Sequence, residues 1–389
     1  MGMGETARTE IADRELASTR ERPASRDESA KENRQLIQLY RILDRILAML
    51  GAVIKKLIAR EGLSDAEVTD CFNTICRGEA DVLQISAFLV LLRAKGETAS
   101  EVTALTRVML EHSIPVSVPG PLLDIVGTGG DGANTVNIST SAAVLAAACG
   151  ARVAKHGNRS VSSRSGSADV LEALGVPMLQ PEHIPACLDG SGIAFMYAPH
   201  FHPAMRHVGP VRKALGVRTV FNILGPLLNP AKAKRLMIGV FTPELLDLMG
   251  HVFLALGVEH ALVVHCQGLD ELTPMGAAQC VEVTQAGGVV PITIDPAEMG
   301  IPPCTVEDLK GGDCDENAEI IRSVFSGGDN AEGPIADAIA LNAGAGMYVY
   351  GSAPSVAEGF AMAKRVLKEG GAATTLASFS QIATALHKE

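Results

Sequence analysis

The sequence contains no tryptophan, and aromatic residues fill only 4% of its 389 positions. Proteins that bind single-stranded nucleic acid stack the bases on aromatic side chains, so this shortage disfavours that class. The formal net charge of −11 acts in the same direction, because an acidic surface repels a polyanion. We therefore expect no nucleic-acid partner. A small anionic substrate would need a site made of a few cations, backbone N–H groups or a metal ion.

Two further absences concern the cellular compartment. No Cys-x-x-Cys pair occurs among the eight cysteines, which we interpret as buried thiols in a reducing cytoplasm. No unbroken apolar run approaches the roughly 20 residues that a membrane-spanning helix needs, so we expect no membrane partner. Residues 1–34 alternate acids with bases and contain no secretory hydrophobic stretch, which predicts a disordered charged tail.

Helical patterns dominate the segment that follows the tail. Apolar residues recur at helical spacing from Leu36 to about residue 60, and residues 82–94 read as a buried helix that ends at Gly96. Ser64 with Glu67, and Thr98 with Glu101, have the spacing of helix-capping boxes. We predict a small all-helical domain over residues 35–117, completed by helices near residues 203–232.

After a Pro- and Gly-containing linker at residues 118–121, short β-like runs alternate with helices. This alternation is typical of an α/β domain with a mainly parallel central sheet flanked by helices, which we predict over residues 118–389. The predicted strands are Leu122–Val126, Arg152–Ala154, Ile193–Tyr197, Leu236–Val240, Ala261–His265, Val281–Thr284 and Val289–Ile294.

A glycine-rich run, Gly127-Thr-Gly-Gly-Asp131, follows the first predicted strand and precedes a helix expected over residues 139–149. Glycines let the backbone approach a ligand closely, and the free N–H groups at a helix start favour negative charge. Asn137, Ser139 and Thr140 add polar side chains there. The run matches neither a Walker A loop nor a dinucleotide fingerprint. Taken alone, it suits a phosphate site or an ordinary turn before a helix.

A second polar run extends from residue 155 to residue 169. Three cations, Lys155, Arg159 and Arg164, lie there among five serines, and Lys155 is expected directly after a strand. Ser167 is predicted to cap a short helix over residues 168–174. Cations beside a helix start suit phosphate oxygens, although a polar surface loop is the alternative. His156 is a candidate base, and a structural or substrate-positioning role is the alternative.

Two further groups complete the set of candidates. Asp270 and Glu271 follow the strand predicted at residues 261–265, and adjacent carboxylates can hold Mg²⁺ or can simply form a solvated turn. The planar guanidinium of Arg212 can pair with a carboxylate, and Arg218 can do the same or pin the chain structurally.

The ordered runs GTGGD, NIST, KHGNR, SGSADVLE, HPAM, FNILGPLLNP and GLDE together resemble the anthranilate phosphoribosyltransferases, over about residues 45–385. The resemblance implies transfer of the phosphoribosyl group of 5-phosphoribosyl 1-diphosphate (PRPP) to the amine of anthranilate. The products are N-(5-phosphoribosyl)anthranilate and diphosphate, within tryptophan biosynthesis. It also implies a homodimer and a Mg²⁺ cofactor with two ions per active site.

The resemblance also implies which residues bind each ligand. It assigns to PRPP the residues Gly127, Gly130, Asp131, Thr135, Asn137, Ile138, Ser139, Thr140, Lys155, His156, Gly157, Asn158, Arg159, Ser160, Val161, Ser162, Ser163 and Ser167. It assigns anthranilate to Gly127, Asn158 and Arg212, and the metal to Ser139, Asp270 and Glu271. No residue is assigned a definite catalytic role beyond the candidate His156.

Two other functions are compatible with parts of the pattern. A pyrimidine nucleoside phosphorylase shares a glycine-rich phosphate loop, but it has no need of the Asn-Ile-Ser-Thr run or of the acidic pair at residues 270 and 271. A non-catalytic relative that binds nucleic acid is opposed by the acidic balance and the few aromatic residues.

Overall fold

The computed structural model describes residue 38, residues 46–160 and residues 164–388, and residues 50–389 form one compact unit. The predicted tail over residues 1–34 lies outside the described residues. Of the helix predicted from Leu36, residues 50–58 are described within the compact unit and are helical. Within the described residues, no helix is both long and apolar enough to cross a bilayer.

Three helices follow: α3 (Asp65–Cys76), α4 (Val82–Lys95) and α5 (Ala99–Glu111). Both predicted capping boxes are confirmed, because the side chains of Ser64 and Thr98 accept from the backbone N–H groups of Glu67 and Glu101 while both carboxylates accept in return. Glu101 is fully buried, and its carboxylate also accepts from Leu63 N and from Lys95 Nζ. This buried acid therefore ties α5 to α4 and to the chain before α3.

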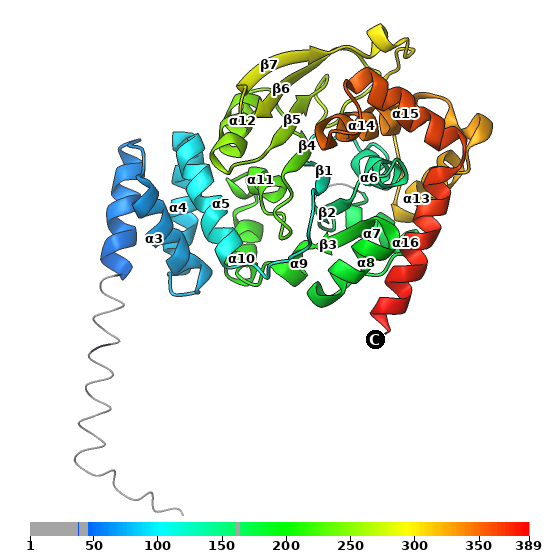
Figure 1. The fold of residues 1–389 in the computed structure, drawn as a ribbon. Helices are drawn as coiled ribbons and strands as arrows, with labels where there is room; N and C mark the ends of the chain where they lie inside the picture. Colours follow the sequence, from blue (N-terminus) through cyan, green and yellow to red (C-terminus); the bar gives the residue numbers. More distant parts are fainter. Residues whose placement is uncertain (1–37, 39–45, 161–163, 389) are drawn as a thin grey trace, which may run out of the picture. The chain divides into compact units, whose positions relative to one another are not determined.

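A seven-stranded sheet forms the centre of the α/β part, in the order β3-β2-β1-β4-β5-β6-β7 (Figure 1). Strands β1 to β5 are parallel, whereas β6 and β7 pair antiparallel at one edge. All seven predicted strands and the mainly parallel sheet are confirmed. The strands are β1 (Leu123–Gly127), β2 (Val153–Gly157), β3 (Ile193–Tyr197), β4 (Arg235–Gly239), β5 (His260–His265), β6 (Ala278–Thr284) and β7 (Gly288–Ile294).

Helices connect and cover the strands. The α-helices are α6 (Ile138–Ala148), α7 (Ser167–Ala173), α8 (Ile184–Ser191), α9 (Ala198–Phe201), α10 (Met205–Leu215), α11 (Phe221–Leu224), α12 (Leu245–Ala255), α13 (Cys314–Phe325), α14 (Pro334–Tyr350), α15 (Val356–Lys368) and α16 (Gly371–His387). Short 3-10 turns are η1 (Pro181–His183), η2 (Gly225–Leu227), η3 (Pro296–Met299), η4 (Val306–Leu309) and η5 (Gly328–Ala331).

The core depends on small residues where helices meet. Helix α14 contacts β1, β4 and β5 as well as α6 and α15, while α12 contacts β5, β6 and β7. A Cβ on Gly344 of α14 would overlap the backbone at Gly359 of α15, and the reverse also holds. Glycine at both positions therefore lets these two helices pack backbone against backbone.

Two local predictions in the second polar run are wrong. Lys155 lies inside β2 and does not follow it. The N-cap of α7 is Gly166 and not Ser167, because the Asp169 carboxylate accepts from both Gly166 N and Ser160 N and draws the loop against the helix start. A Cβ on Gly166 would overlap the backbone of Ser160, so only glycine fits at the cap.

Candidate functional site

The site forms where the parallel strands end. Gly127 ends β1 and pairs in register with Gly239, which ends β4. A Cβ on Gly127 would overlap the Asp270 carboxylate, and one on Gly239 would overlap the Asp270 backbone. The two glycines thus make room for the acidic segment at the carboxyl edge of the sheet, where open α/β folds bind ligands.

Asp270 and Glu271 join the glycine-rich run to the helix that follows it. Asp270 Oδ2 accepts from Gly129 N at 2.5 Å, and Glu271 Oε1 accepts from Ser139 N, in the first turn of α6, at 3.1 Å. Both carboxylates are buried, with 6% and 9% of the residues exposed. The structure therefore brings the acidic pair against the glycine-rich run and the start of α6, although more than 130 residues separate them in the sequence.

The ionised forms of Asp270 and Glu271 are disfavoured in this site, although hydrogen bonds and Lys155 partly stabilise them. Burial raises the pKa of Asp270, and the nearby Asp131 raises it further. Burial and Asp270 likewise raise the pKa of Glu271. A bound cation would relieve this repulsion, and carboxylate oxygens are the donors that Mg²⁺ takes.

The described residues contain no group of three or more His, Cys, Asp and Glu side chains arranged to hold a metal ion. A hard cation at the acidic pair would therefore need other oxygen ligands as well. This fits Mg²⁺, which usually keeps water molecules and substrate phosphates beside one or two carboxylates.

Lys155 lies near enough to Glu271 for the two charges to interact. Its side chain is almost fully buried, and its Nζ donates to the Ile125 carbonyl at 2.5 Å. Burial lowers the pKa of Lys155, while the charges of Asp124 and Glu271 raise it. Asn229 in turn donates to the Asp124 carboxylate at 2.7 Å and to the Ala154 carbonyl at 2.8 Å. These contacts join β1 and β2 under the site.

His156 is also buried in β2, with its ring centroid 5.1 Å from that of His202. Burial, followed by His202, lowers the pKa of His156 to about 3. The imidazole is therefore neutral near pH 7 and a weak base. This environment suits a positioning role better than proton abstraction.

The arginines of the second run are paired with carboxylates. Arg159 lies 2.9 Å from Asp169 and 2.7 Å from Glu172, and Arg164 lies 3.6 Å from Glu316. The local positive charge predicted there is thus largely compensated within the chain. Val161, Ser162 and Ser163 lie outside the described residues.

Other predicted PRPP residues differ in how they could reach a ligand. Ile138 and Thr140 are buried, and the Ile138 N–H already donates to the Val136 carbonyl at 2.7 Å. Asp131 accepts from Ala133 N at 3.0 Å, and Thr135 pairs with Lys310 in an isolated β-bridge. The remaining predicted binding residues are half-buried or exposed; they are Gly127, Gly130, Asn137, Ser139, Gly157, Asn158, Ser160 and Ser167.

The two candidate arginines, Arg212 and Arg218, have different surroundings. Arg212, on α10, is half-buried, and its guanidinium carbon lies 5.1 Å from the centroid of the Phe221 ring. Arg218 lies 4.2 Å over the Phe241 ring and donates to the Gly130 carbonyl. Of the two roles left open for Arg218, the structure supports the structural one, since this residue anchors the glycine-rich run.

Sequence reasoning missed several residues that support the site. Asn342 of α14 accepts from Leu272 N at 3.0 Å and donates to the Leu272 carbonyl at 2.7 Å, which fixes the chain directly after Glu271. Asn229, in the FNILGPLLNP run, contacts Asp124, and Asn317 of α13 contacts Asn137. No local pattern signals these amides, because each bonds to a segment remote in sequence.

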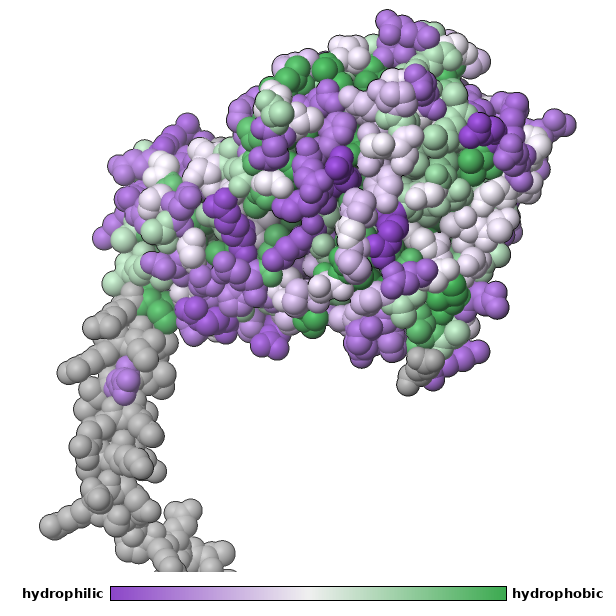
Figure 2. All heavy atoms as spheres, viewed as in Figure 1, coloured by the Kyte–Doolittle hydropathy of each residue, from purple (hydrophilic) through white to green (hydrophobic). Residues whose placement is uncertain are grey.

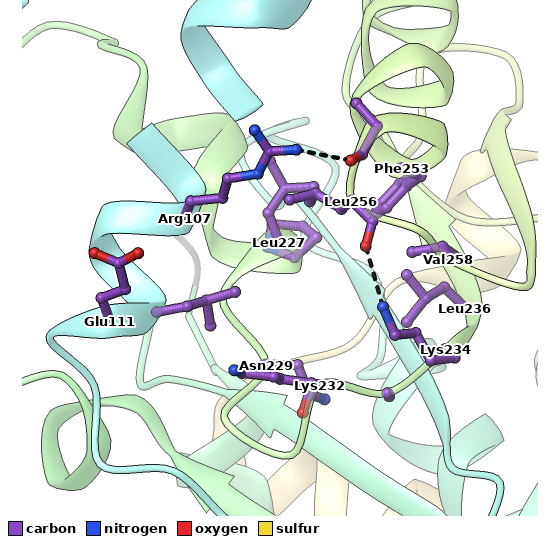
Figure 3. Close-up of a pocket in the computed structure, with 14 residues that line it drawn as sticks. Arg107, Glu111, Leu227, Asn229, Lys232, Lys234, Leu236, Phe253, Leu256 and Val258 are labelled. Carbon is purple, nitrogen blue, oxygen red and sulfur yellow. Dashed lines mark hydrogen bonds between the residues drawn. The ribbon is translucent and has the colours of Figure 1, made fainter. Parts of the chain in front are cut away.

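A cavity of about 340 Å³ lies elsewhere, between α5, α12 and the start of β4 (Figure 3). Arg107 donates to the Ala255 carbonyl at 3.0 Å across it, and Lys234 donates to the Leu256 carbonyl at 3.1 Å. Leu236 lines this cavity near the beginning of β4, whereas Gly239 ends the same strand at Asp270. We therefore locate the functional site at the acidic pair and not in this cavity.

The comparison with protein families agrees with this architecture. Residues 119–373 match the glycosyl transferase family, a/b domain, and residues 52–113 match the glycosyl transferase family, helical bundle domain. Fold and site together define a glycosyltransferase in which a helical bundle precedes an α/β domain.

Individual relatives narrow the class. The anthranilate phosphoribosyltransferase of Chlamydia caviae is 45% identical over 334 residues, which cover 85% of this chain and 96% of the relative. The crystal structure of the enzyme of that name from Thermus thermophilus is 45% identical, with a TM-score of 0.80, and covers 85% of this chain and 99% of the other. The chain belongs to the anthranilate phosphoribosyltransferase family.

A more distant structure carries ligands. Anthranilate phosphoribosyltransferase from Saccharomyces cerevisiae, in complex with PRPP and Mg, is 29% identical with a TM-score of 0.80. The match covers 87% of this chain and 99% of the yeast chain.

Proposed function

We propose that the protein transfers the phosphoribosyl group of PRPP to the amine of anthranilate, in tryptophan biosynthesis. The observation that carries this proposal is the convergence of Asp270 and Glu271 on the glycine-rich run and on the first turn of α6. This arrangement suits a magnesium diphosphate better than the free phosphate of a nucleoside phosphorylase. The relatives support the transferase and neither alternative.

We assign Mg²⁺ to Asp270 and Glu271, with Ser139 and substrate oxygens as further donors and two ions per active site. The raised pKa values of the two buried carboxyl groups support the assignment, because a cation offsets their repulsion. The yeast relative was solved with Mg and PRPP. When bound, the metal would neutralise charge on the departing diphosphate.

The predicted PRPP residues would place the diphosphate against the glycine-rich run and the start of α6, including Gly130, Asn137 and Ser139. Backbone N–H groups at the start of α6 favour negative charge there. Gly127, Asn158 and Arg212 would bind anthranilate. Arg212 suits its carboxylate, because Phe221 holds the planar guanidinium while leaving it half-buried.

In the reaction, the bond from the ribose anomeric carbon to diphosphate breaks, a bond from that carbon to nitrogen forms, and the amine loses one proton. The neutral aromatic amine is already nucleophilic, so no strong base needs to act before the attack. The weakly basic His156 is consistent with this, since positioning and charge stabilisation would supply most of the rate.

We propose that the protein forms a homodimer, which the exposed apolar side chains support, and that it acts in the cytoplasm, which the buried thiols support. The large apolar side chains exposed on the helical part include Ile58, Val82, Leu83 and Val90. Over the face drawn in Figure 2, hydrophilic and hydrophobic side chains are interspersed. All eight cysteines lie among the described residues and five of them are buried, as expected of thiols in a reducing compartment. We also propose that residues 35–117 and 118–389 act as two domains.

The direct test follows the fluorescence of anthranilate after PRPP and Mg²⁺ are added to the purified protein. We expect the signal to fall with time, and to stay constant when PRPP is omitted or when EDTA removes the metal. A constant signal in the complete mixture, together with phosphate-dependent cleavage of thymidine, would instead identify a nucleoside phosphorylase.

A further inference from the structure

Asn317, on α13, contacts the site from a segment that carries none of the recognised motifs. It is 1% exposed, and its Nδ2 donates to Asn137 Oδ1 at 2.9 Å. Asn137 occupies the N-cap position of α6 but makes no side-chain cap hydrogen bond to its own helix. The Asn137 side chain is therefore held by other parts of the chain.

A backbone donor fixes the orientation of both amides. Gly312 N donates to Asn317 at 2.8 Å, so the atom that faces it must be Oδ1, which turns Asn317 Nδ2 toward Asn137. Asn137 must then present its own oxygen to Asn317. The loop is closely fitted around this amide, because a Cβ on Gly311 would overlap Asn317 Oδ1.

The same orientation connects two phosphate-binding segments. Asn137 Nδ2 donates to the Ser165 carbonyl at 3.2 Å, and Ser165 Oγ donates to Asn137 Oδ1 at 3.1 Å. Asn137 thus joins the start of α6 to the loop that precedes α7. Its Nδ2 carries a second hydrogen for which the described residues provide no acceptor, and a sugar or phosphate oxygen could accept it.

We propose that Asn317 is a positioning residue for PRPP: by fixing the rotamer and amide orientation of Asn137, it keeps one N–H available to the substrate and holds the two phosphate-binding segments at a fixed distance. This inference rests on the proposed function, since it concerns the affinity for PRPP. It predicts that loss of Asn317 weakens PRPP binding without a comparable effect on anthranilate.

The test compares Asn317→Ala and Asn317→Asp with the wild type. The aspartate keeps the acceptor for Gly312 N but cannot donate to Asn137. We expect both variants to raise KM for PRPP about fivefold to tenfold, as the loss of one buried hydrogen bond would. KM for anthranilate and kcat should change less than twofold. Asn330→Ala, an exposed amide beyond the end of α13, is the matched control and should behave as the wild type.

A double-mutant cycle separates positioning from a general structural role. In an Asn137→Ala background, Asn317→Ala should cause no further loss of PRPP affinity, measured by calorimetric titration with PRPP and Mg²⁺. Equal multiplicative losses in both backgrounds, an equal rise of both KM values, or failure of both Asn317 variants to fold would overturn the inference. Wild-type protein that does not consume anthranilate would instead overturn the proposed function.

Discussion

Asp270 shows how a residue acquires a function that its neighbours in sequence do not reveal. Its carboxylate is buried because Gly127 and Gly239 have no side chains, and it accepts a hydrogen bond from Gly129. Glu271 is held in the same way by the first turn of α6. At the scale of single residues, the site is a pair of buried acids whose pKa values are raised by burial and by nearby carboxylates.

Replacement of this pair tests the metal assignment. The double variant Asp270→Asn with Glu271→Gln should lose at least a hundredfold in Mg²⁺-dependent turnover. Its thermal unfolding in EDTA should occur at the wild-type temperature or above it, because neutral amides do not suffer the repulsion that raises both pKa values. Turnover near the wild-type rate would show that these residues do not hold the metal.

At the scale of elements, α10 and the segment after it connect the helical part to the site. Helix α10 packs against α3 and α4, and Arg212 in its last turn lies against Phe221 of α11. Arg218, a few residues further, holds the Gly130 carbonyl. One segment therefore carries both the proposed carboxylate partner and the anchor of the glycine-rich run.

The Arg212→Ala variant should raise KM for anthranilate about tenfold to a hundredfold, the range for a charged hydrogen bond that is lost. KM for PRPP should change much less. Lys213→Ala, an exposed neighbour on the same helix turn, should leave both constants unchanged. A larger effect of Arg212→Ala on PRPP than on anthranilate would mean that the two substrates lie the other way round.

At the scale of the whole molecule, burial of neutral histidines links folding to pH. Burial lowers the pKa of His156 to about 3 and that of His202 to about 4, against an ordinary value near 6.5. At a pH between the lowered pKa of each folded histidine and its ordinary value near 6.5, the unfolded chain binds protons that the folded chain does not. The stability contributed by these neutral rings is complete above about pH 6.5 and is lost as the pH falls toward 4.

His202→Gln should therefore reduce the loss of unfolding free energy between pH 7 and pH 5, measured by urea denaturation. Below about pH 6.5, the free energy of unfolding should fall less steeply with pH in the variant than in the wild type, by up to about 1.4 kcal/mol per pH unit. His251→Gln, at an exposed position, should leave the pH dependence unchanged. The same pH dependence in all three proteins would show that His202 is not buried in its neutral form.

The sequence predicted the strands and the capping boxes because these depend on local hydrophobic periodicity and on pairs three residues apart. It failed at Lys155 and Ser167, where long-range packing decided the outcome. Lys155 became a buried strand residue with a carbonyl partner, and Asp169 drew Gly166 into the cap position. The assignments of individual ligand-binding residues stay predictions, because they concern contacts with PRPP, anthranilate and Mg²⁺ and not contacts within the chain.

By itself, the sequence determined the order of the elements, the mainly parallel sheet and the family resemblance, because ordered motifs and local periodicity do not require knowledge of distant contacts. Only the tertiary structure decided that the glycine-rich run, the acidic pair and α13 meet at one edge of the sheet. It also decided that Asn317 orients Asn137 and that the second run's arginines are paired with acids. The physical reason is that hydrogen bonds and charge interactions act over a few ångströms in space, whereas these partners lie between 10 and 180 positions apart along the chain.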